Sequence, residues 1–162
     1  MNNYLKSGYL STVDLSDFLP DLSLIKDHQV AVTECVQEIP CNPCVTSCPT
    51  RSIFMKDIND IPHVDFETCI GCGKCVAVCP GLAMFMIRIN GTQGEVTLPY
   101  ELIPLPKKGE EVNLLNRKGE IIGRGVVTKI FLPEREIHSA VVTVTFKDAK
   151  ILNEVRNIEV IK

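Results

Sequence analysis

All eight cysteines of this 162-residue chain lie between Cys35 and Cys79. Disulfides are typical of small exported proteins, and the first residues, MNNYLKSGYLSTVDL, have neither the apolar core nor the cleavage site of a secretory signal. Such crowding in a reducing compartment is typical of thiolate ligands for metal. We therefore expect a cytoplasmic metal-binding protein.

The cysteine region contains an internal repeat. Residues 41–55 match residues 72–86 at an offset of 31 positions, and both segments contain Cys-Pro. Upstream the offset grows to 34, so that Cys35 matches Cys69 and the first half has three extra residues. Each half predicts a short strand, a cysteine loop, a helical turn that ends at Cys-Pro, and another strand, because proline cannot continue a helix.

The second half of the repeat has the cysteine spacing of bacterial ferredoxins. Cys69, Cys72 and Cys75 are separated by two residues each, and Cys79-Pro80 follows after three more. This is the pattern C-x2-C-x2-C-x3-C-P, in which the fourth cysteine ligates the other cluster of a two-cluster protein. The first half keeps the last three cysteines and has five residues in its first interval, which costs little loop entropy.

Crossed ligation therefore predicts two [4Fe-4S] clusters, called cluster one and cluster two below. Structural zinc in sites of four cysteines remains an alternative, as does a [3Fe-4S] centre in the first half if its first cysteine is not a ligand. The predicted ligands of cluster one are Cys35, Cys41, Cys44 and Cys79, and those of cluster two are Cys69, Cys72, Cys75 and Cys48.

The two predicted clusters differ in their sequence surroundings. Pro40 and Pro43, in the first loop, cannot donate an N–H to a cluster sulfur. Glu34 and Glu38 flank that loop, whereas Lys74 lies in the second. Because hydrogen bonds and nearby charge both tune a cluster's reduction potential, we expect cluster two to have the higher potential.

Composition divides the chain into three regions. Residues 1–27 are too apolar for a free tail and are expected to pack on the chain or on a partner. Residues 28–90 form the predicted ferredoxin domain. Residues 91–162 contain five or six β-branched runs separated by turn-forming Pro, Gly and charged residues. The predicted fold class is α+β, with a two-cluster ferredoxin-like domain followed by a small antiparallel β-barrel or curled-sheet domain.

Other classes of site have little support in the sequence. A net charge of -3 provides no basic patch for nucleic acid, and no apolar run approaches the about 20 residues of a membrane-spanning helix. His28, His63 and His138 are isolated from one another, and residues 91–96 lack the spacing of a nucleotide-binding loop. We therefore predict no catalytic residue, no nucleic-acid partner and no membrane insertion.

Three longer stretches resemble one protein family. They are VAVTECVQEIPCNPCVTSCPT, DFETCIGCGKCVAVCPGLA and TLPYELIPLPKKGEEVNLLNRKGEIIGRGVVTKI. They are similar to small 4Fe-4S subunits of flavin-dependent amino or imino acid dehydrogenase complexes, of the proline/hydroxyproline dehydrogenase and sarcosine oxidase-like type. The resemblance implies a hetero-oligomer with FAD-containing partner subunits, often with a small [2Fe-2S] subunit. It also implies that this chain carries electrons and does not bind the amine.

These features together predict a non-catalytic electron-transfer subunit. It would pass electrons one at a time through two [4Fe-4S] clusters, from or to a flavoprotein partner, with the β-rich region as a docking module. The alternatives are an independent soluble ferredoxin with an appended stabilising β domain, and an enzyme whose β domain binds substrate or flavin. A subunit should expose a large apolar patch when isolated, whereas a carrier should not.

Overall fold

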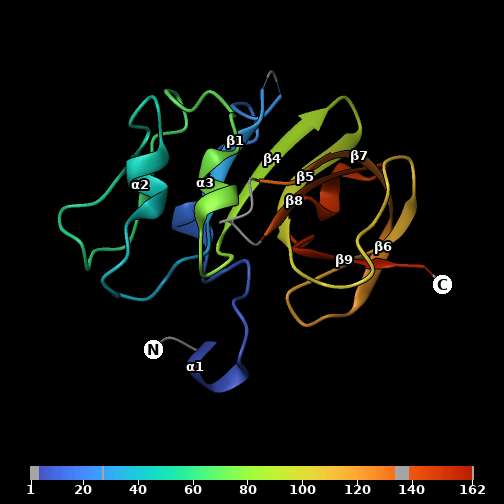
Figure 1. Cartoon of the computed structure of the whole chain (residues 1–162), viewed down its shortest axis with the longest axis horizontal. Helices are drawn as coiled ribbons and strands as arrows, with labels where there is room; N and C mark the ends of the chain where they lie inside the picture. The colour runs from blue at the N-terminus through green and yellow to red at the C-terminus, as the bar shows by residue number, and fades with distance from the viewer. Residues whose placement is uncertain (1–3, 27, 134–138, 162) are drawn as a thin grey trace.

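The structure is a computed structural model that describes residues 4–26, 28–133 and 139–161 (Figure 1). Strands dominate it, so the predicted α+β class overstates the helical part, and no helix in these ranges is long and apolar enough to cross a membrane. The helical elements are α1 Tyr4–Ser7, η1 Ser16–Phe18, α2 Pro43–Ser47, α3 Lys74–Val78 and η2 Ala149–Ile151. The strands are β1 Val30–Thr33, β2 Ile53–Phe54, β3 His63–Val64, β4 Met84–Asn90, β5 Gln93–Tyr100, β6 Glu111–Leu115, β7 Ile121–Phe131, β8 Ala140–Phe146 and β9 Asn157–Val160.

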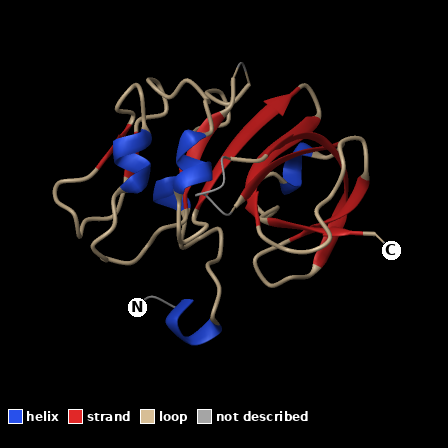
Figure 2. Ribbon diagram, viewed as in Figure 1, coloured by secondary structure: helices blue, strands red, loops and turns tan. Residues whose placement is uncertain are grey.

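Seven of these strands form one antiparallel sheet in the order β1-β4-β5-β8-β7-β6-β9. Figure 2 shows the strands curling through the larger part of the molecule. The sheet stays open, because β1 and β9 are its two edges. Of the two predicted forms, a barrel or a curled sheet, the barrel is therefore wrong: the edge of β5 that would have to close it pairs with β4 of the cysteine region instead.

The internal repeat is visible in the backbone, and the order of elements predicted for each half is confirmed. The helices α2 and α3 end just before Cys48 and Cys79, whose φ and ψ angles are -76° and 112°, and -75° and 110°. Three residues later, the N–H groups of Arg51 and Leu82 donate to the carbonyls of these two cysteines, each at 3.3 Å. Arg51 and Leu82 also share a positive φ, of 58° and 53°.

Strand pairing exchanges the two halves of the repeat. The first strand of one half, β1, pairs with the last strand of the other, β4, and β2 pairs with β3 in a separate two-stranded sheet. The two cysteine helices, α2 and α3, lie beside each other as a result (Figure 1). A cysteine at the end of one half is thereby brought near the loop of the other.

The hydrophobic core runs without interruption from the cysteine region into the C-terminal strands. Val76 of α3, Met86 of β4, Leu98 of β5 and Val142 of β8 are all buried in one cluster. The expected boundary after residue 90 falls in the tight connection between the paired strands β4 and β5. The division into domains stays a prediction, but the two regions share a sheet.

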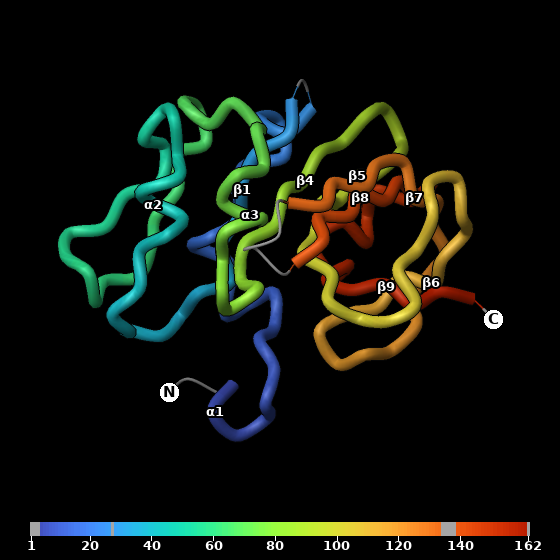
Figure 3. The backbone as a smooth tube through the Cα atoms, in the orientation of Figure 1, coloured from blue at the N-terminus to red at the C-terminus, as the bar shows by residue number. Residues whose placement is uncertain are grey.

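The N-terminal segment is packed against this core. Leu15 and Ile25 are fully buried, and the carbonyl of Ile25 accepts a hydrogen bond of 2.8 Å from the N–H of Ile89 in β4. Figure 3 traces the segment from α1, which stands apart from the sheet, to the start of β1. At least two apolar side chains of this segment are therefore buried within the chain itself, in agreement with the expectation that the segment packs.

Candidate iron–sulfur centre

The structure brings together the four predicted ligands of cluster one. Cys35 follows β1, Cys41 precedes α2, Cys44 lies in α2, and Cys79 follows α3. Burial raises the pKa of the Cys35 thiol, and the neighbouring Cys79 and Cys41 thiols raise it further. Burial, with Cys79, Cys35 and Cys41 nearby, raises the pKa of Cys44 to about 11. Thiols from both halves of the repeat thus lie within electrostatic reach of one another.

A backbone hydrogen bond just beyond the paired ends of β1 and β4 joins the two halves of this group. The N–H of Ala83 donates to the sulfur of Cys79 at 3.4 Å, and the carbonyl of Ala83 accepts from the N–H of Glu34 at 2.8 Å. The next N–H, that of Cys35, donates to the hydroxyl of Thr33 at 3.2 Å. The strand pairing that the repeat creates therefore places Cys35 beside Cys79.

The four predicted ligands of cluster two line a single pocket. Cys69 and Cys75 are buried in it, Cys48 is half-buried, and Cys72 is exposed. The N–H of Ala31 in β1 donates to the sulfur of Cys69 at 3.4 Å. Burial, reinforced by the neighbouring Cys69 and Cys72, raises the pKa of Cys75 to about 12. Cys48, from the first half, again shares a site with three cysteines from the second.

Cys48 is electrostatically different from the other members of this group. Its burial raises the pKa of the thiol, but hydrogen bonds from the backbone of Ile53, the hydroxyl of Thr50 and the backbone of Ser52 lower it by more. The Thr50 hydroxyl lies 3.7 Å from the sulfur. The net effect is a pKa below the ordinary thiol value, so this thiolate forms more readily.

The described thiols do not lie as close together as the ligands of one bound metal ion would. A zinc ion binds sulfur at about 2.3 Å, which brings its four sulfurs to within about 4 Å of one another. Across the described ranges, no three Cys, His, Asp or Glu side chains converge closely enough to hold one metal ion. The eight cysteines are free thiols, and four thiolates suit structural zinc as well as an iron–sulfur cluster, so the choice between the two rests on the cysteine spacing.

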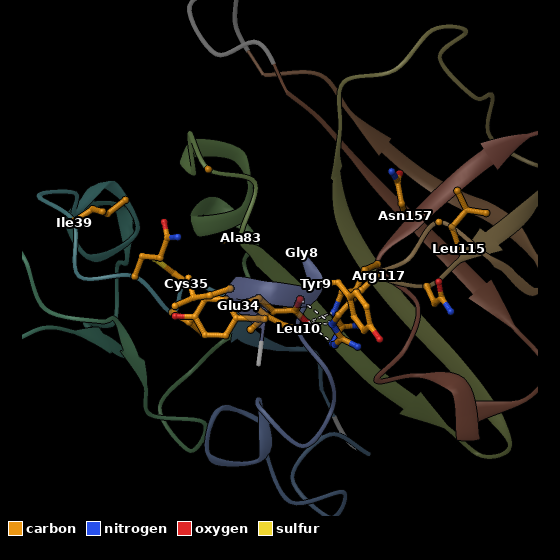
Figure 4. A pocket seen from close by; sticks show the side chains of 18 residues that line it. Gly8, Tyr9, Leu10, Glu34, Cys35, Ile39, Ala83, Leu115, Arg117 and Asn157 are labelled. Carbon is orange, nitrogen blue, oxygen red and sulfur yellow. Dashed lines mark hydrogen bonds and ion pairs between the residues drawn. The ribbon is translucent and has the colours of Figure 1, made fainter. Parts of the chain in front are cut away.

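An ionic cluster next to Cys35 was missed by sequence reasoning. The carboxylate of Glu34 accepts hydrogen bonds from Arg117, at 2.6 Å and 3.0 Å, and from Nε of Arg156. The side chains of Glu34, Arg117 and Arg156 are only 10%, 7% and 4% exposed. Figure 4 shows Glu34 joined to Arg117 close to Cys35. The arginines lie 83 and 122 positions from Glu34, so no local motif signals them.

The buried charges of this ionic cluster stabilise one another. Burial alone would raise the pKa of Glu34, but the hydrogen bonds and charges of the two arginines outweigh it and hold this pKa below its ordinary value. Burial lowers the pKa of Arg156, and Glu34 opposes that effect. The Arg156 guanidinium also lies over the ring of Phe85, 5.0 Å from its centre, and its Nη2 has no hydrogen-bond partner. Two buried cations therefore surround one buried anion.

Neither of the two described histidines, His28 and His63, lines the pocket that contains the cysteines of cluster two. The ring of His63 stacks on Phe54, with the ring centres 5.8 Å apart. His28 is half-buried, and His138 lies outside the described residues. The contact of His63 is a packing interaction between the short strands β2 and β3.

Comparison with known proteins points to the same chemistry as the cysteine geometry. Residues 34–83, which contain all eight cysteines, match the family model of the 4Fe-4S dicluster domain. No curated protein matches the chain, and no solved structure matches it. The family match implies [4Fe-4S] binding by this segment and an iron–sulfur role in electron transfer. It therefore supports a ferredoxin-like iron–sulfur protein.

Proposed function

We propose that this chain is an electron-transfer subunit with two [4Fe-4S] clusters, working with a FAD-containing amino or imino acid dehydrogenase. The observation that carries the proposal is the gathering of the cysteines into two groups of four, each drawn from both halves of the repeat. A flavin releases two electrons, and two one-electron clusters can accept them in turn. The resemblance to dehydrogenase subunits supplies the class of partner.

The chain's own residues would bind and insulate the clusters. The thiols of Cys44 and Cys75, with pKa values raised to about 11 and about 12, are protonated at neutral pH until a metal displaces the proton. Met84 and Met86, both fully buried, limit the access of water from the side of β4. Cys72 is the exposed ligand of its group and is the natural point for electrons to enter or leave.

Crossed ligation is testable with two matched variants. In anaerobically purified protein, Cys79→Ser should change the electron paramagnetic resonance signal of cluster one and leave that of cluster two intact. Cys48→Ser should do the reverse, because it removes the fourth ligand of cluster two. Iron and sulfide analysis of the wild type should give two [4Fe-4S] clusters per chain; iron-free protein with a full complement of zinc would refute the proposal.

An exposed apolar patch favours a bound subunit over a free carrier. Its most exposed members are Ile103, at 95%, and Leu132, at 63%. They come from the loop after β5 and from the residue that follows β7. Four members of the patch line a hollow of about 340 Å³: Leu102, Leu105, Leu132 and Pro133. A surface of this kind on a monomer is typical of a site that a partner covers. The patch consists of Leu102, Ile103, Leu105, Phe131, Leu132 and Pro133.

The apolar patch continues toward cluster two. Phe131 and Pro133 also line a cavity of about 930 Å³ whose other walls include Cys72 and Lys74. A partner that covers the patch and also fills this cavity would reach Cys72, the exposed ligand of cluster two. This supports a route in which electrons cross between the flavoprotein and cluster two.

Co-purification tests the partner directly. A tagged wild-type chain, expressed in its native cells and recovered without oxygen, should bring down FAD-containing subunits and any small [2Fe-2S] subunit. The double variant Ile103→Ser and Leu132→Ser should recover at least tenfold less flavin with its own iron content unchanged. Val13→Ser, at a side chain that is 81% exposed and in the N-terminal segment, is the control and should behave as the wild type. A monomeric wild type without flavin would favour the independent carrier, and flavin on the isolated chain would favour the enzyme.

A further inference from the structure

We propose that the ionic cluster of Glu34, Arg117 and Arg156 positions Cys35 and raises the reduction potential of cluster one. The inference rests on the proposed function, since it assumes that Cys35 ligates a [4Fe-4S] cluster. It assigns a role to residues from the C-terminal region, outside the segment that matches the dicluster model.

The positioning argument begins with the extended loop of the first half. Cys35 starts an interval of five residues before Cys41, so the loop alone constrains Cys35 less than the short interval constrains Cys69. The preceding residue, Glu34, is fixed at both ends: its N–H is bound to the carbonyl of Ala83, and its carboxylate to two arginines. The ionic cluster therefore restrains the position of Cys35, which the longer loop alone leaves less constrained.

The arginines themselves sit on rigid backbone. Arg156 lies just before β9, and its own N–H donates to the carbonyl of Leu115, at the end of β6, at 2.9 Å. Its Nη1 donates to the carbonyls of Leu152 and Val155, at 3.2 Å and 2.6 Å. Arg117 lies in the turn after β6 and also donates to the carbonyl of Asn153 at 2.7 Å. The guanidinium groups are thus held in place before they bind Glu34.

The potential argument follows from the charges. Glu34 with two arginines leaves one net positive charge, buried next to Cys35. Glu154 pairs with Arg117 at 3.3 Å and offsets part of this charge, but its side chain is 43% exposed, so its charge is better solvated than that of the buried groups. A cluster becomes more negative on reduction, and a buried positive charge stabilises that reduced state. From the sequence, Glu34 is expected to lower the potential of cluster one. Its two arginine partners, Arg117 and Arg156, reverse that effect.

Two single variants should shift the potential in opposite directions. A unit charge about 10 Å away, at an effective dielectric constant of about 20, changes such an equilibrium roughly tenfold. Glu34→Gln removes a negative charge, so the ratio of reduced to oxidised cluster one at a fixed potential should rise roughly tenfold, or about 59 mV for a one-electron couple. Arg156→Met removes a positive charge and should lower the ratio by a similar factor. The double variant should return to within threefold of the wild type, because its net charge is restored.

The measurement is a redox titration of the anaerobic protein followed by electron paramagnetic resonance, with iron per chain determined for each variant. Glu38→Gln is the control, since Glu38 flanks the same loop but is exposed to solvent, and it should not shift the potential. If Arg156→Met does not retain cluster one, Arg117→Met replaces it with the same expected direction. Arg117→Lys should then keep the potential of cluster one, because the positive charge remains. It should bind less iron per chain, because lysine cannot make the bidentate contact with the Glu34 carboxylate that positions Cys35.

The outcomes separate this inference from the proposed function. Wild-type protein without [4Fe-4S] clusters would refute the proposed function. Wild-type protein with both clusters, whose variants leave the potential of cluster one unchanged or shift it in the same direction, would overturn the inference alone. If the single variants lost iron but did not shift the potential of cluster one in opposite directions, the ionic cluster would only support the structure. The part of the inference that concerns the potential would then be overturned.

Discussion

Gly71 illustrates how one missing side chain shapes the pocket of cluster two. Its φ is 67°, and a Cβ at this position would lie 2.5 Å from the carbonyl oxygen of Gln29. The nearby Gly73 also has a positive φ, of 74°, but a Cβ there would meet nothing within 4 Å. The two glycines of one loop therefore have different reasons to be glycine: Gly71 allows close packing, and Gly73 only allows the turn that starts α3.

Alanine substitutions should separate these two roles. Gly71→Ala should lower the free energy of unfolding by about 2 kcal/mol or more, because strain and a backbone clash combine. Gly73→Ala should cost only about 1 kcal/mol, the conformational penalty of a left-handed alanine. Anaerobic urea denaturation of the iron-loaded proteins checks the difference, and equal losses would contradict the close contact with Gln29.

Glu34 should stabilise the protein by a constant amount near neutral pH. Its pKa in the folded protein is lowered, so its contribution is complete above the ordinary value of 4.5 and is lost only as the pH falls through the lower, folded value. Glu34→Gln should therefore reduce the free energy of unfolding by about 3 kcal/mol, as expected for a broken buried ion pair.

The size of that reduction should be the same at pH 6, 7 and 8 in anaerobic denaturation experiments. Glu38→Gln, in the same loop and exposed, should have little effect at any of these values. If the difference in free energy of unfolding between the wild type and Glu34→Gln became smaller from pH 8 to pH 6, the Glu34 carboxyl would be taking up a proton in that range. Such a result would contradict the direction of its pKa shift.

Among the secondary-structure elements, α2 and α3 are too short to be stable by themselves. Each has five residues, and isolated helices of this length do not form in water. Both therefore depend on packing and, by our proposal, on the clusters. Their packing is unequal: Val76 of α3 is fully buried, whereas Val45, at the matching position of α2, is only partly buried.

This inequality predicts different costs for the same substitution. Val76→Ala should lower the free energy of unfolding by about 2 kcal/mol, because it leaves a cavity in the core. Val45→Ala should cost about 1 kcal/mol, since less apolar surface is lost there. Thermal or urea denaturation of the two iron-loaded variants provides the comparison, and a larger loss for Val45→Ala would argue against the packing described for α3.

The sequence predicts the local elements of both regions. The five or six β-branched runs of residues 91–162 correspond to the five strands β5 to β9 that the structure describes there. The repeat and the Cys-Pro pairs locate α2 and α3, because these features are local. The pairing of β5 with β4 and the contact of Glu34 with Arg117 depend on tertiary packing between separate elements, which no short pattern encodes. The predicted grouping of the cysteines rests on the spacing of a known cluster motif, which contains long-range information.

At the level of the whole molecule, the cysteine region and the C-terminal strands are parts of one sheet. Strand β4 is paired on one side with β1 and on the other with β5. Its residues Met84 and Met86 are buried in the same core as Leu98 of β5. The C-terminal strands thus complete the surroundings of β4 as well as carrying the apolar patch.

Removal of residues 91–162 should therefore prevent the cysteine region from folding. The truncated chain would expose the apolar side chains of β4 and one of its hydrogen-bonding edges, so we expect an aggregated product with little iron. The full-length chain should instead unfold in a single transition. A soluble fragment of residues 1–90 with a full iron content would contradict this expectation and would support an independent ferredoxin domain.

The open sheet has one more consequence, for how the chain meets others. Strand β9, Asn157–Val160, is bonded only to β6 among the strands described, so its outer backbone amides and carbonyls face no neighbouring strand. A bare strand edge is a template that another polypeptide can extend, and four residues with a central Glu159 make it a short and charged one. When the isolated chain is concentrated, we expect self-association to begin at this edge of β9. A strand from a binding protein that paired with the edge would prevent it.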